Sequence, residues 1–306
     1  MHKLSRTWHF EWQIAIRKKG GAQTLYSGNR KGFVPVPNTF RYWYADPFLF
    51  THEGKDYLFA EMYDRWREKG VLGVCRIRNG KCGRFKMCLE LPWHLSYPCV
   101  FEDETGIHML PECYQSGEIA LYRFVKFPYR WEKEAVLLHE IGVDTTPCMD
   151  HGQRRWLTTL FPSVTDRRNC NLWQLDATGA KKICLFKENY TVRGAGHLIA
   201  EGDTWIRPSQ NCTDSYGQNL IFNRGRFDNG IYCESPFCVV YPPTAEDQEN
   251  RLELQPGTMK KAYDGIHTYN ENERYEVVDL RYSGAKSVIT LWKNLCSHMA
   301  AKRKRG

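Results

Sequence analysis

The sequence predicts an all-β protein, a five-bladed β-propeller with a short C-terminal helix. A unit of short strand, Gly-bearing turn and second short strand recurs along the chain. Its equivalent positions Pro47, Pro98, Pro147 and Gly196 lie 51, 49 and 49 residues apart. A period of about 50 residues built from such units indicates radial β repetition, in which each unit starts one blade. A β-sandwich whose strands are evenly spaced by chance is the alternative.

The four copies of the unit share their order of strand and turn residues. The first runs from Ala45-Asp46-Pro47-Phe48 through Gly54 to Asp56–Glu61, and the second from Tyr97-Pro98 through Gly106 to Ile107–Glu112. The third begins at Thr146-Pro147 and turns at Gly152, and the fourth begins at Ala195-Gly196 and turns at Gly202. A propeller gathers the starts of its inner strands around one axis, so polar residues at those starts become neighbours.

We expect one propeller domain over residues 1–285, followed by a C-terminal helix and basic tail over 286–306. The blades are expected near residues 44–91, 96–139, 144–188, 193–240 and 265–282, the last completed by a closing strand at 8–17. The interval between Gly196 and His267 is the longest, and its Pro-containing, polar segment 241–251 predicts an insertion or long loop. The one convincing helical stretch is Val288–Ala301.

Composition narrows the range of partners. The chain has 43 Lys and Arg against 35 Asp and Glu, a net charge of +8, with basic residues concentrated towards both ends. Basic ends favour solubility or weak contact with anions, and no segment matches a nucleic-acid-binding module, so we expect no nucleic-acid partner. The aromatic content of 14% suits packed sheets and platforms on which sugar rings stack.

Cysteine usage and hydropathy give an expected location. Residues 1–20 hold no uninterrupted apolar run of the kind found in secretory signals, and no stretch is long and apolar enough to span a bilayer. The 12 cysteines are scattered without a Cys-x-x-Cys pair, which is typical of reduced thiols and argues against a zinc site. We therefore expect a cytoplasmic protein with no cofactor and no bound metal.

Carboxylates at axis-facing positions are the first candidates for chemistry. Asp46 heads the first inner strand, Asp144 opens the third blade, and Glu61 and Glu112 close second strands at matching places in blades one and two. Cleavage of a glycosidic bond requires one carboxylic acid to protonate the leaving oxygen and one carboxylate to activate water or attack. A structural role in capping turns is the alternative for Asp46 and Asp144.

A second group is basic or amide-bearing. Arg193 and His267 open blades four and five, whereas Arg207 and Gln210 lie in or after the second strand of blade four. A guanidinium inside an apolar strand must meet a carboxylate or an anion, so Arg207 is expected to bind a ligand anion or an acid such as Asp144 or Glu112. Aromatic side chains beside these strand ends are candidates for sugar stacking: Trp43, Tyr44, Tyr63, Trp66, Tyr97, Tyr114 and Tyr216.

Taken together, these residues resemble a known pattern. Asp46-Pro47-Phe48, Pro111-Glu112, Arg193-Gly194-Ala195-Gly196, Arg207-Pro208-Ser209-Gln210 and His267-Thr268-Tyr269-Asn270 resemble the N-terminal domain of glucosamine inositolphosphorylceramide transferases, a five-bladed propeller similar to glycoside hydrolase family 43. The resemblance covers about residues 8–282. It implies that Asp46 matches the hydrolases' general base and Glu112 their general acid. Those hydrolases carry a further Asp that tunes the acid, where this chain has Tyr97-Pro98; Asp144 is the possible substitute.

The leading functional hypothesis is a glycosidase-like carbohydrate-active protein. Asp46, Glu112 and Asp144 are its expected catalytic residues, and Glu61, Tyr97, Arg193, Arg207, Gln210 and His267 are expected to contact the substrate, a glycan or glycoconjugate precursor. Two alternatives remain open. One is a propeller that binds an anionic sugar or nucleotide-sugar without turnover, and the other is a sugar transferase or accessory domain in glycan biosynthesis, although no Asp-x-Asp nucleotide-binding signature is present.

Overall fold

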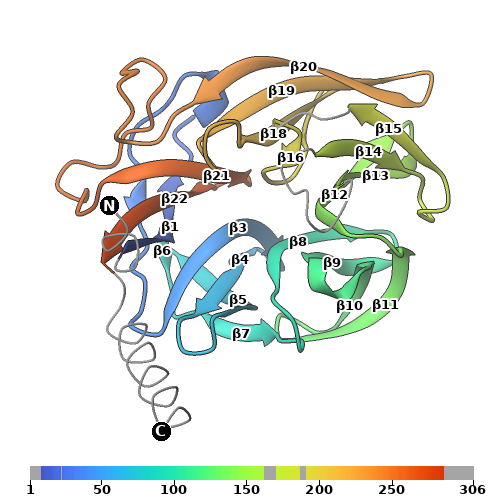
Figure 1. The fold of residues 1–306 in the computed structure, drawn as a ribbon, viewed down its shortest axis with the longest axis horizontal. Coiled ribbons are helices and arrows are strands. Elements are labelled where there is room, and N and C mark those ends of the chain that lie inside the picture. The colour runs from blue at the N-terminus through green and yellow to red at the C-terminus, as the bar shows by residue number, and fades with distance from the viewer. Residues whose placement is uncertain (1–7, 22, 162–169, 187–190, 286–306) are drawn as a thin grey trace, which may run out of the picture.

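The computed structural model describes residues 8–21, 23–161, 170–186 and 191–285. Five antiparallel β-sheets surround a central axis as the blades of a propeller (Figure 1), which confirms the predicted fold class. In these ranges the helical elements are two short 3₁₀ helices, η2 (Leu25–Ser27) and η3 (Tyr114–Ser116). Within the same ranges, no helix has the length and apolar character needed to cross a membrane. The helix expected at Val288–Ala301 lies outside the described residues.

Each blade is one sheet, and in blades one to three the strands follow the chain from the axis outwards. Blade one contains β3 (Tyr42–His52), β4 (Lys55–Asp64) and β5 (Lys69–Arg78), with β6 (Lys81–Cys82) and β7 (Lys86–Leu89) both paired to β5. Blade two contains β8 (Ser96–Asp103), β9 (Gly106–Glu112), β10 (Ile119–Lys126) and β11 (Arg130–Leu138). Blade three contains β12 (Gly142–Asp150), β13 (Gln153–Leu160), β14 (Asn171–Leu175) and β15 (Lys182–Phe186).

Blades four and five complete the ring. Blade four contains β16 (Arg193–Gly194), β17 (Ile199–Glu201), β18 (Thr204–Asn211), β19 (Asn219–Asp228) and β20 (Ile231–Val240). Blade five contains β21 (Tyr263–Glu271), β22 (Tyr275–Ala285), β1 (Trp8–Lys18) and β2 (Val34–Pro35). The segment 241–262 between these blades contains no strand and is tied down by two isolated bridges, Phe33–Leu254 and Tyr241–Arg251.

Strand β1 closes the ring because it adds to the last blade as its third strand. It pairs with β22 along its whole length, from Trp8 opposite Ala285 to Lys18 opposite Tyr275. A buried ion pair reinforces this seam, with Arg17 Nε donating to Glu276 Oε2 at 2.8 Å. The other oxygen of Glu276 accepts hydrogen bonds from the Leu25 amide and the Tyr269 hydroxyl. Closure in this way joins strands from distant parts of the chain in one blade, so that the first and last strands of the ring hold each other in place.

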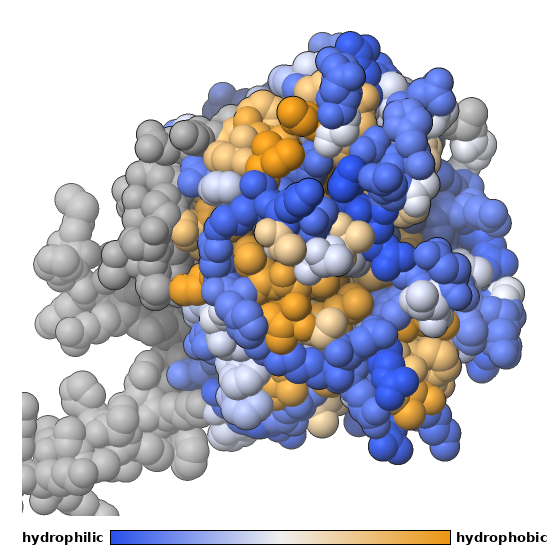
Figure 2. All heavy atoms as spheres, turned by 90° about the vertical axis from the view of Figure 1, so that its right-hand side faces the viewer, coloured by the Kyte–Doolittle hydropathy of each residue, from blue (hydrophilic) through white to orange (hydrophobic). Residues whose placement is uncertain are grey.

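The hydrophobic core lies between neighbouring blades. Phe59 of blade one meets Trp131 of blade two edge to face, and Phe222 of blade four meets Tyr269 of blade five in the same way. These rings bury large apolar areas and favour such edge-to-face geometry. The outer surface is mixed: on the side of the ring that carries β15, small apolar patches alternate with hydrophilic side chains (Figure 2).

The inner strands of four blades carry an irregularity at the same place. The pairing register shifts between Ala45 and Phe48, between Ser96 and Cys99, between Val143 and Thr146, and between Ile266 and Tyr269. Inside the first three bulges, Asp46, Tyr97 and Asp144 have φ angles of 48°, 46° and 54°. A bulge redirects a side chain, and a left-handed conformation costs a non-glycine residue about 1–2 kcal/mol. Three such residues at one level of the ring mark this level as a site.

The side chain of Tyr97 connects three blades. Its side chain is 1% exposed, and its hydroxyl accepts a hydrogen bond from the Gly196 amide at 2.9 Å. The same hydroxyl donates to the Gly196 carbonyl at 3.1 Å and shares a hydrogen bond with Thr146 Oγ1 at 2.9 Å. Tyr97 therefore links blades two, three and four.

We expect Tyr97→Phe to lower the free energy of unfolding by about 1–3 kcal/mol, because the buried Gly196 amide would lose its acceptor. The measurement is urea unfolding followed by circular dichroism. Tyr129→Phe is the control, since Tyr129 is exposed, and it should change stability by less than about 0.5 kcal/mol. Equal stability of the two variants would contradict the linking role of Tyr97.

Candidate functional site

The site is a cluster of ionisable side chains around the axis, contributed by all five blades. Asp46 and Asp144 project from the bulges of β3 and β12, and His267 lies in the bulge of β21. Glu61 and Glu112 stand opposite the residues that precede two of the bulges, Ala45 and Ser96, which places them at equivalent positions of β4 and β9. Arg193 begins β16. Of the residues predicted for the site, these six are brought together.

One half of the cluster is centred on His267. Its Nδ1 lies 2.7 Å from Asp279 Oδ1, and its Nε2 faces Asp46 Oδ1 at 3.6 Å. Asp46 Oδ2 accepts a hydrogen bond from the Tyr97 amide, and Asp46 Oδ1 accepts one from the Thr268 hydroxyl. All three ionisable side chains are buried. An imidazole thus lies between two carboxylates inside the protein.

Burial dominates the electrostatics of Asp46. Desolvation raises the pKa of its carboxyl from 3.8 to about 7; the charge of His267 opposes this rise and those of Asp279, Glu61 and Asp144 add to it. The pKa of the His267 ring is also raised. Burial lowers it, but the Asp279 and Asp46 carboxylates raise it by more. Both pKa values therefore lie above those of the free side chains, and the buried pair takes up protons at a higher pH than a free aspartate and a free histidine do.

The other half of the cluster is centred on Arg193. Its Nε and Nη2 donate to the two oxygens of Asp144 at 2.7 and 3.1 Å, a bidentate arrangement. The same Nη2 lies 3.5 Å from Glu112 Oε2. Burial and the neighbouring Asp144 carboxylate raise the pKa of Glu112 well above its usual value, and Arg193 offsets only part of that rise. Glu112 therefore holds a proton at a pH where an ordinary glutamate does not.

Aromatic rings form one wall of the cluster. Trp12 of β1 stacks on the His267 ring at a centroid distance of 3.7 Å, and Tyr216 meets both rings edge-on. Tyr216 is 39% exposed, and Arg193 lies over its ring at 5.3 Å. Gly217 has φ +64°, and a Cβ there would lie 2.6 Å from Trp12 and 2.9 Å from His267, so only glycine fits beside this stack.

A second aromatic pair lies beside Glu61. Trp43 and Tyr63 are parallel at 4.5 Å, and Trp66 on the following turn is 40% exposed. His94 Nδ1 accepts a hydrogen bond from the Gly70 amide, which leaves Nε2 directed at Glu61 Oε1, 3.2 Å away. Exposed aromatic faces near carboxylates suit the stacking of sugar rings. Tyr44, by contrast, is buried against Phe85.

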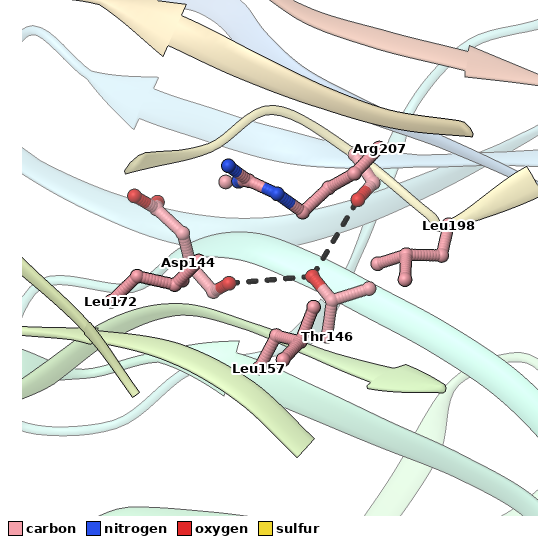
Figure 3. Close-up of a pocket in the computed structure, with 8 residues that line it drawn as sticks. Asp144, Thr146, Leu157, Leu172, Leu198 and Arg207 are labelled. Atoms are coloured by element: carbon pink, nitrogen blue, oxygen red, sulfur yellow. Dashed lines mark hydrogen bonds between the residues drawn. The ribbon is translucent and has the colours of Figure 1, made fainter. Parts of the chain in front are cut away.

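Arg207, Gln210 and Tyr97 are held by other protein groups. The Arg207 guanidinium donates to both oxygens of Glu234 on β20, rather than to Asp144 or Glu112. Gln210 donates its amide to the Gly194 carbonyl at 2.7 Å. Arg207 also lines a cavity of about 10 Å³ between blades three and four, with Asp144, Thr146, Leu157, Leu172 and Leu198 around it (Figure 3). That space suits about one water molecule and not a sugar.

Sequence reasoning did not single out Asp279, Trp12 or His94. Asp279 had the clearest signal, because it is the one charged residue in the apolar run Val277-Val278-Asp279-Leu280. A buried carboxylate needs several donors, and Asp279 accepts four hydrogen bonds. Trp12 lies on the closing strand, so its place beside His267 depends on the register of β1 against β22.

Asp46, His267 and Asp279 carry the donor atoms that metal sites use. One ligand atom from each lies within 4.8 Å of the other two. The donors are already engaged, however, since Asp279 accepts four hydrogen bonds and Asp46 accepts two. We describe this trio as an internally satisfied cluster and assign no metal to it.

We expect Asp46→Asn to change how stability depends on pH. A carboxyl with a folded pKa of about 7 and an unfolded pKa near 3.8 binds more protons when folded between these values. Its contribution to the free energy of unfolding therefore falls as the pH rises from about 4 to about 7. Relative to wild type, the variant should gain stability across this window in urea unfolding, whereas Asp264→Asn, at an exposed ion pair with Arg281, should not. A constant difference would contradict the burial effect.

We expect Arg207→Met to destabilise the fold by about 3–5 kcal/mol, because it leaves the buried Glu234 carboxylate without its partner. Arg224→Met is the matched control, since Arg224 and Glu201 form an exposed pair worth less than about 1 kcal/mol. Chemical unfolding measures both variants. A fully stable Arg207→Met protein would instead mean that Arg207 is free to bind a ligand.

Known structures share this fold. A thermostable family-43 glycoside hydrolase superimposes with a TM-score of 0.55 at 12% identity, over 81% of this chain and 91% of that one. The GH43_1 enzyme from Xanthomonas citri complexed with xylotriose gives a TM-score of 0.54 at 9% identity, over 82% and 88% of the two chains. At such low identities the likeness establishes the propeller architecture alone.

Sequence relatives define the family. Glucosamine inositolphosphorylceramide transferase 1 of Oryza sativa subsp. japonica is 29% identical over 187 residues, which is 58% of this chain and 25% of that protein. The protein of the same name from Arabidopsis thaliana is 28% identical over 187 residues, 58% and 24% of the two chains. This chain thus spans about a quarter of the length of these curated relatives. Residues 36–234 match the family model described as Glucosamine inositolphosphorylceramide transferase 1, N-terminal, so the chain belongs to this family.

Proposed function

We propose that this chain acts on a glycosidic bond of a glycan or glycoconjugate precursor, with Glu112 as general acid and Asp46 as general base. The observation that carries the proposal is a pair of carboxyls with raised pKa, Asp46 buried and Glu112 largely buried, each beside a basic side chain at one level of a five-bladed ring. Proton-transfer catalysis works best when the pKa of the acid and of the base lies near the working pH.

The proposed roles follow from the surroundings of each acid. Glu112 keeps its proton because burial and Asp144 oppose its ionisation, so it can protonate the oxygen of the leaving group. Asp46, ionised beside the protonated His267, can accept a proton from water or from a sugar hydroxyl as that oxygen attacks the anomeric carbon. Water as the acceptor gives hydrolysis, and a hydroxyl gives transfer. In both cases the bond between anomeric carbon and leaving oxygen breaks, and Glu112 loses its proton.

Asp144 and Arg193 have supporting roles in this proposal. The Arg193 guanidinium donates two hydrogen bonds to Asp144, and its Nη2 also lies 3.5 Å from Glu112 Oε2. The two side chains therefore set the charge around the acid, which is a role that the sequence had suggested for Asp144. The exposed rings of Tyr216 and Trp66 offer stacking surfaces for the sugar.

A propeller that binds sugar without turnover is the second candidate. It is favoured by the contact between Arg193 and Glu112, since a glutamate that is ionised in an ion pair has no proton to give to a leaving group. An anionic sugar fits this candidate less well than a neutral one. Arg207 is neutralised by Glu234, and Arg193 by Asp144, so neither guanidinium is left over for a ligand anion.

Glu112→Gln tests the proposed acid. Replacing the proton donor should reduce turnover of substrates with poor leaving groups by about 10²–10⁴-fold and that of nitrophenyl glycosides much less, because nitrophenolate leaves without protonation. Binding of the same sugars, measured by calorimetry, should be retained. Glu102→Gln, at an exposed position of β8, is the control and should behave as wild type.

Two outcomes would overturn the assignment. If Glu112→Gln lost turnover equally on substrates with good and with poor leaving groups, Glu112 would not be the general acid. Sugar binding by the wild type with no turnover on any glycoside tested, including nitrophenyl compounds, would favour the binding propeller.

A further inference from the structure

We propose that Asp279 is a positioning residue that holds His267 as an imidazolium with its Nε2–H directed at Asp46, so that the buried Asp46 remains a carboxylate. The catalytic meaning of this inference rests on the proposed role of Asp46 as general base. The arrangement itself is a property of the folded protein and is measurable without any substrate.

The first step is the set of hydrogen bonds around Asp279. Its Oδ1 accepts from the His267 amide at 3.3 Å, from His267 Nδ1 at 2.7 Å and from the Thr268 amide at 2.9 Å. Its Oδ2 accepts from the Asp46 amide at 2.8 Å. A single carboxylate on β22 therefore fixes the backbone of β21 and of the β3 bulge, and with them the side chains of His267 and Asp46.

The second step is the choice of proton position on the imidazole. Because Nδ1 donates to Asp279, any further proton on the ring sits on Nε2, which faces Asp46 Oδ1 at 3.6 Å. A carboxylate on each side stabilises the doubly protonated ring. Trp12, stacked at 3.7 Å, covers one face of the ring, and Tyr216 closes its edge, so water does not compete for either nitrogen from these sides.

The third step concerns the charges that face Asp46 from the other blades. Glu61, Asp144 and Asp279 all oppose its ionisation, and His267 is the group that favours it. Arg193 acts on the ring as well, because its positive charge opposes protonation of His267. Without the negative charge of Asp279 behind it, the ring would lose its proton to Asp46, and Asp46 would then be neutral and unable to act as a base.

The hydrogen bond from His267 Nδ1 to Asp279 therefore keeps one proton on the other ring nitrogen, Nε2. In the resting site the proton lies on His267 Nε2 and Asp46 carries the negative charge. When Asp46 accepts a proton from the attacking oxygen, both groups are protonated until one proton leaves. No oxidant or additional reactant takes part, and the proton count is conserved at each stage.

The test is ¹⁵N NMR of histidine-labelled protein of residues 1–306, with the His267 signals assigned by their loss in His267→Asn. In the wild type, both ring nitrogens of His267 should be protonated at pH 7, and the ring should titrate above its ordinary value of about 6.5. Asp279→Asn should lower that titration by about one pH unit or more. Asp264→Asn, at an exposed position of the same blade, should leave it unchanged.

Asp279 binds the backbone of both β21 and β3, so Asp279→Asn could fail to fold. A second variant therefore tests the same arrangement. Asp46→Asn keeps the Asp279 contact and should also lower the titration of His267, because it removes the other carboxylate. A wild-type ring that is unprotonated at Nε2 at pH 7, or a titration that neither variant moves, would overturn the proposal. A raised titration in a protein without turnover would leave the positioning role intact and remove the catalytic one.

Discussion

The pairing of β1 with β22 is the constraint on which the rest of the structure depends. A propeller is stable only as a closed ring, because each blade buries its faces against two neighbours. Here the ring closes between strands from opposite ends of the described chain, and the seam is fixed by eleven residue pairs and the buried Arg17–Glu276 ion pair. Every distance across the axis, including those between acids of different blades, follows from that closure.

The central site concentrates charge that the fold must compensate. Asp46, Asp144 and Asp279 are all buried, and burial of a carboxylate without donors is costly. The compensation is divided between two cations, His267 and Arg193, and a set of backbone amides held in place by the bulges. The left-handed conformations of Asp46, Tyr97 and Asp144 belong to the same arrangement, since strain of this kind is stored where the surrounding structure holds it in place.

The five-bladed ring could be predicted because its first four blades begin with the same local unit of strand, Gly-bearing turn and strand, which repeats about every 50 residues. Blade two, for example, was expected near residues 96–139, and its strands run from Ser96 to Leu138. The six ionisable residues that meet at the axis were found because equivalent repeat positions converge in a propeller. The structure sets Arg207 apart, because its partner Glu234 lies two strands further out, and no sequence rule pairs β18 with a particular residue of β20.

Asp279 and Trp12 belong to the site, but comparison of equivalent positions in the repeating units does not identify them. Asp279 occupies a position one residue away from the level of Glu61 and Glu112, so comparison of the blades passes over it. Trp12 belongs to a strand that lies outside the repeating units in sequence and joins the last blade only by closure. Residues of this kind become visible when the register between distant strands is known.

The stacking of Trp12 on His267 makes the surroundings of the site depend on the pairing of β1 with β22. A wall of the cluster is supplied by the strand that seals the ring, so the site cannot exist in a partly assembled propeller. A molecule with four blades formed and β1 unpaired would carry Asp46, Glu112 and Asp144 but would leave the His267 imidazole open to water on the face that Trp12 covers. The complete cluster therefore requires β1 to be paired with β22, and opening of the seam would expose it to water.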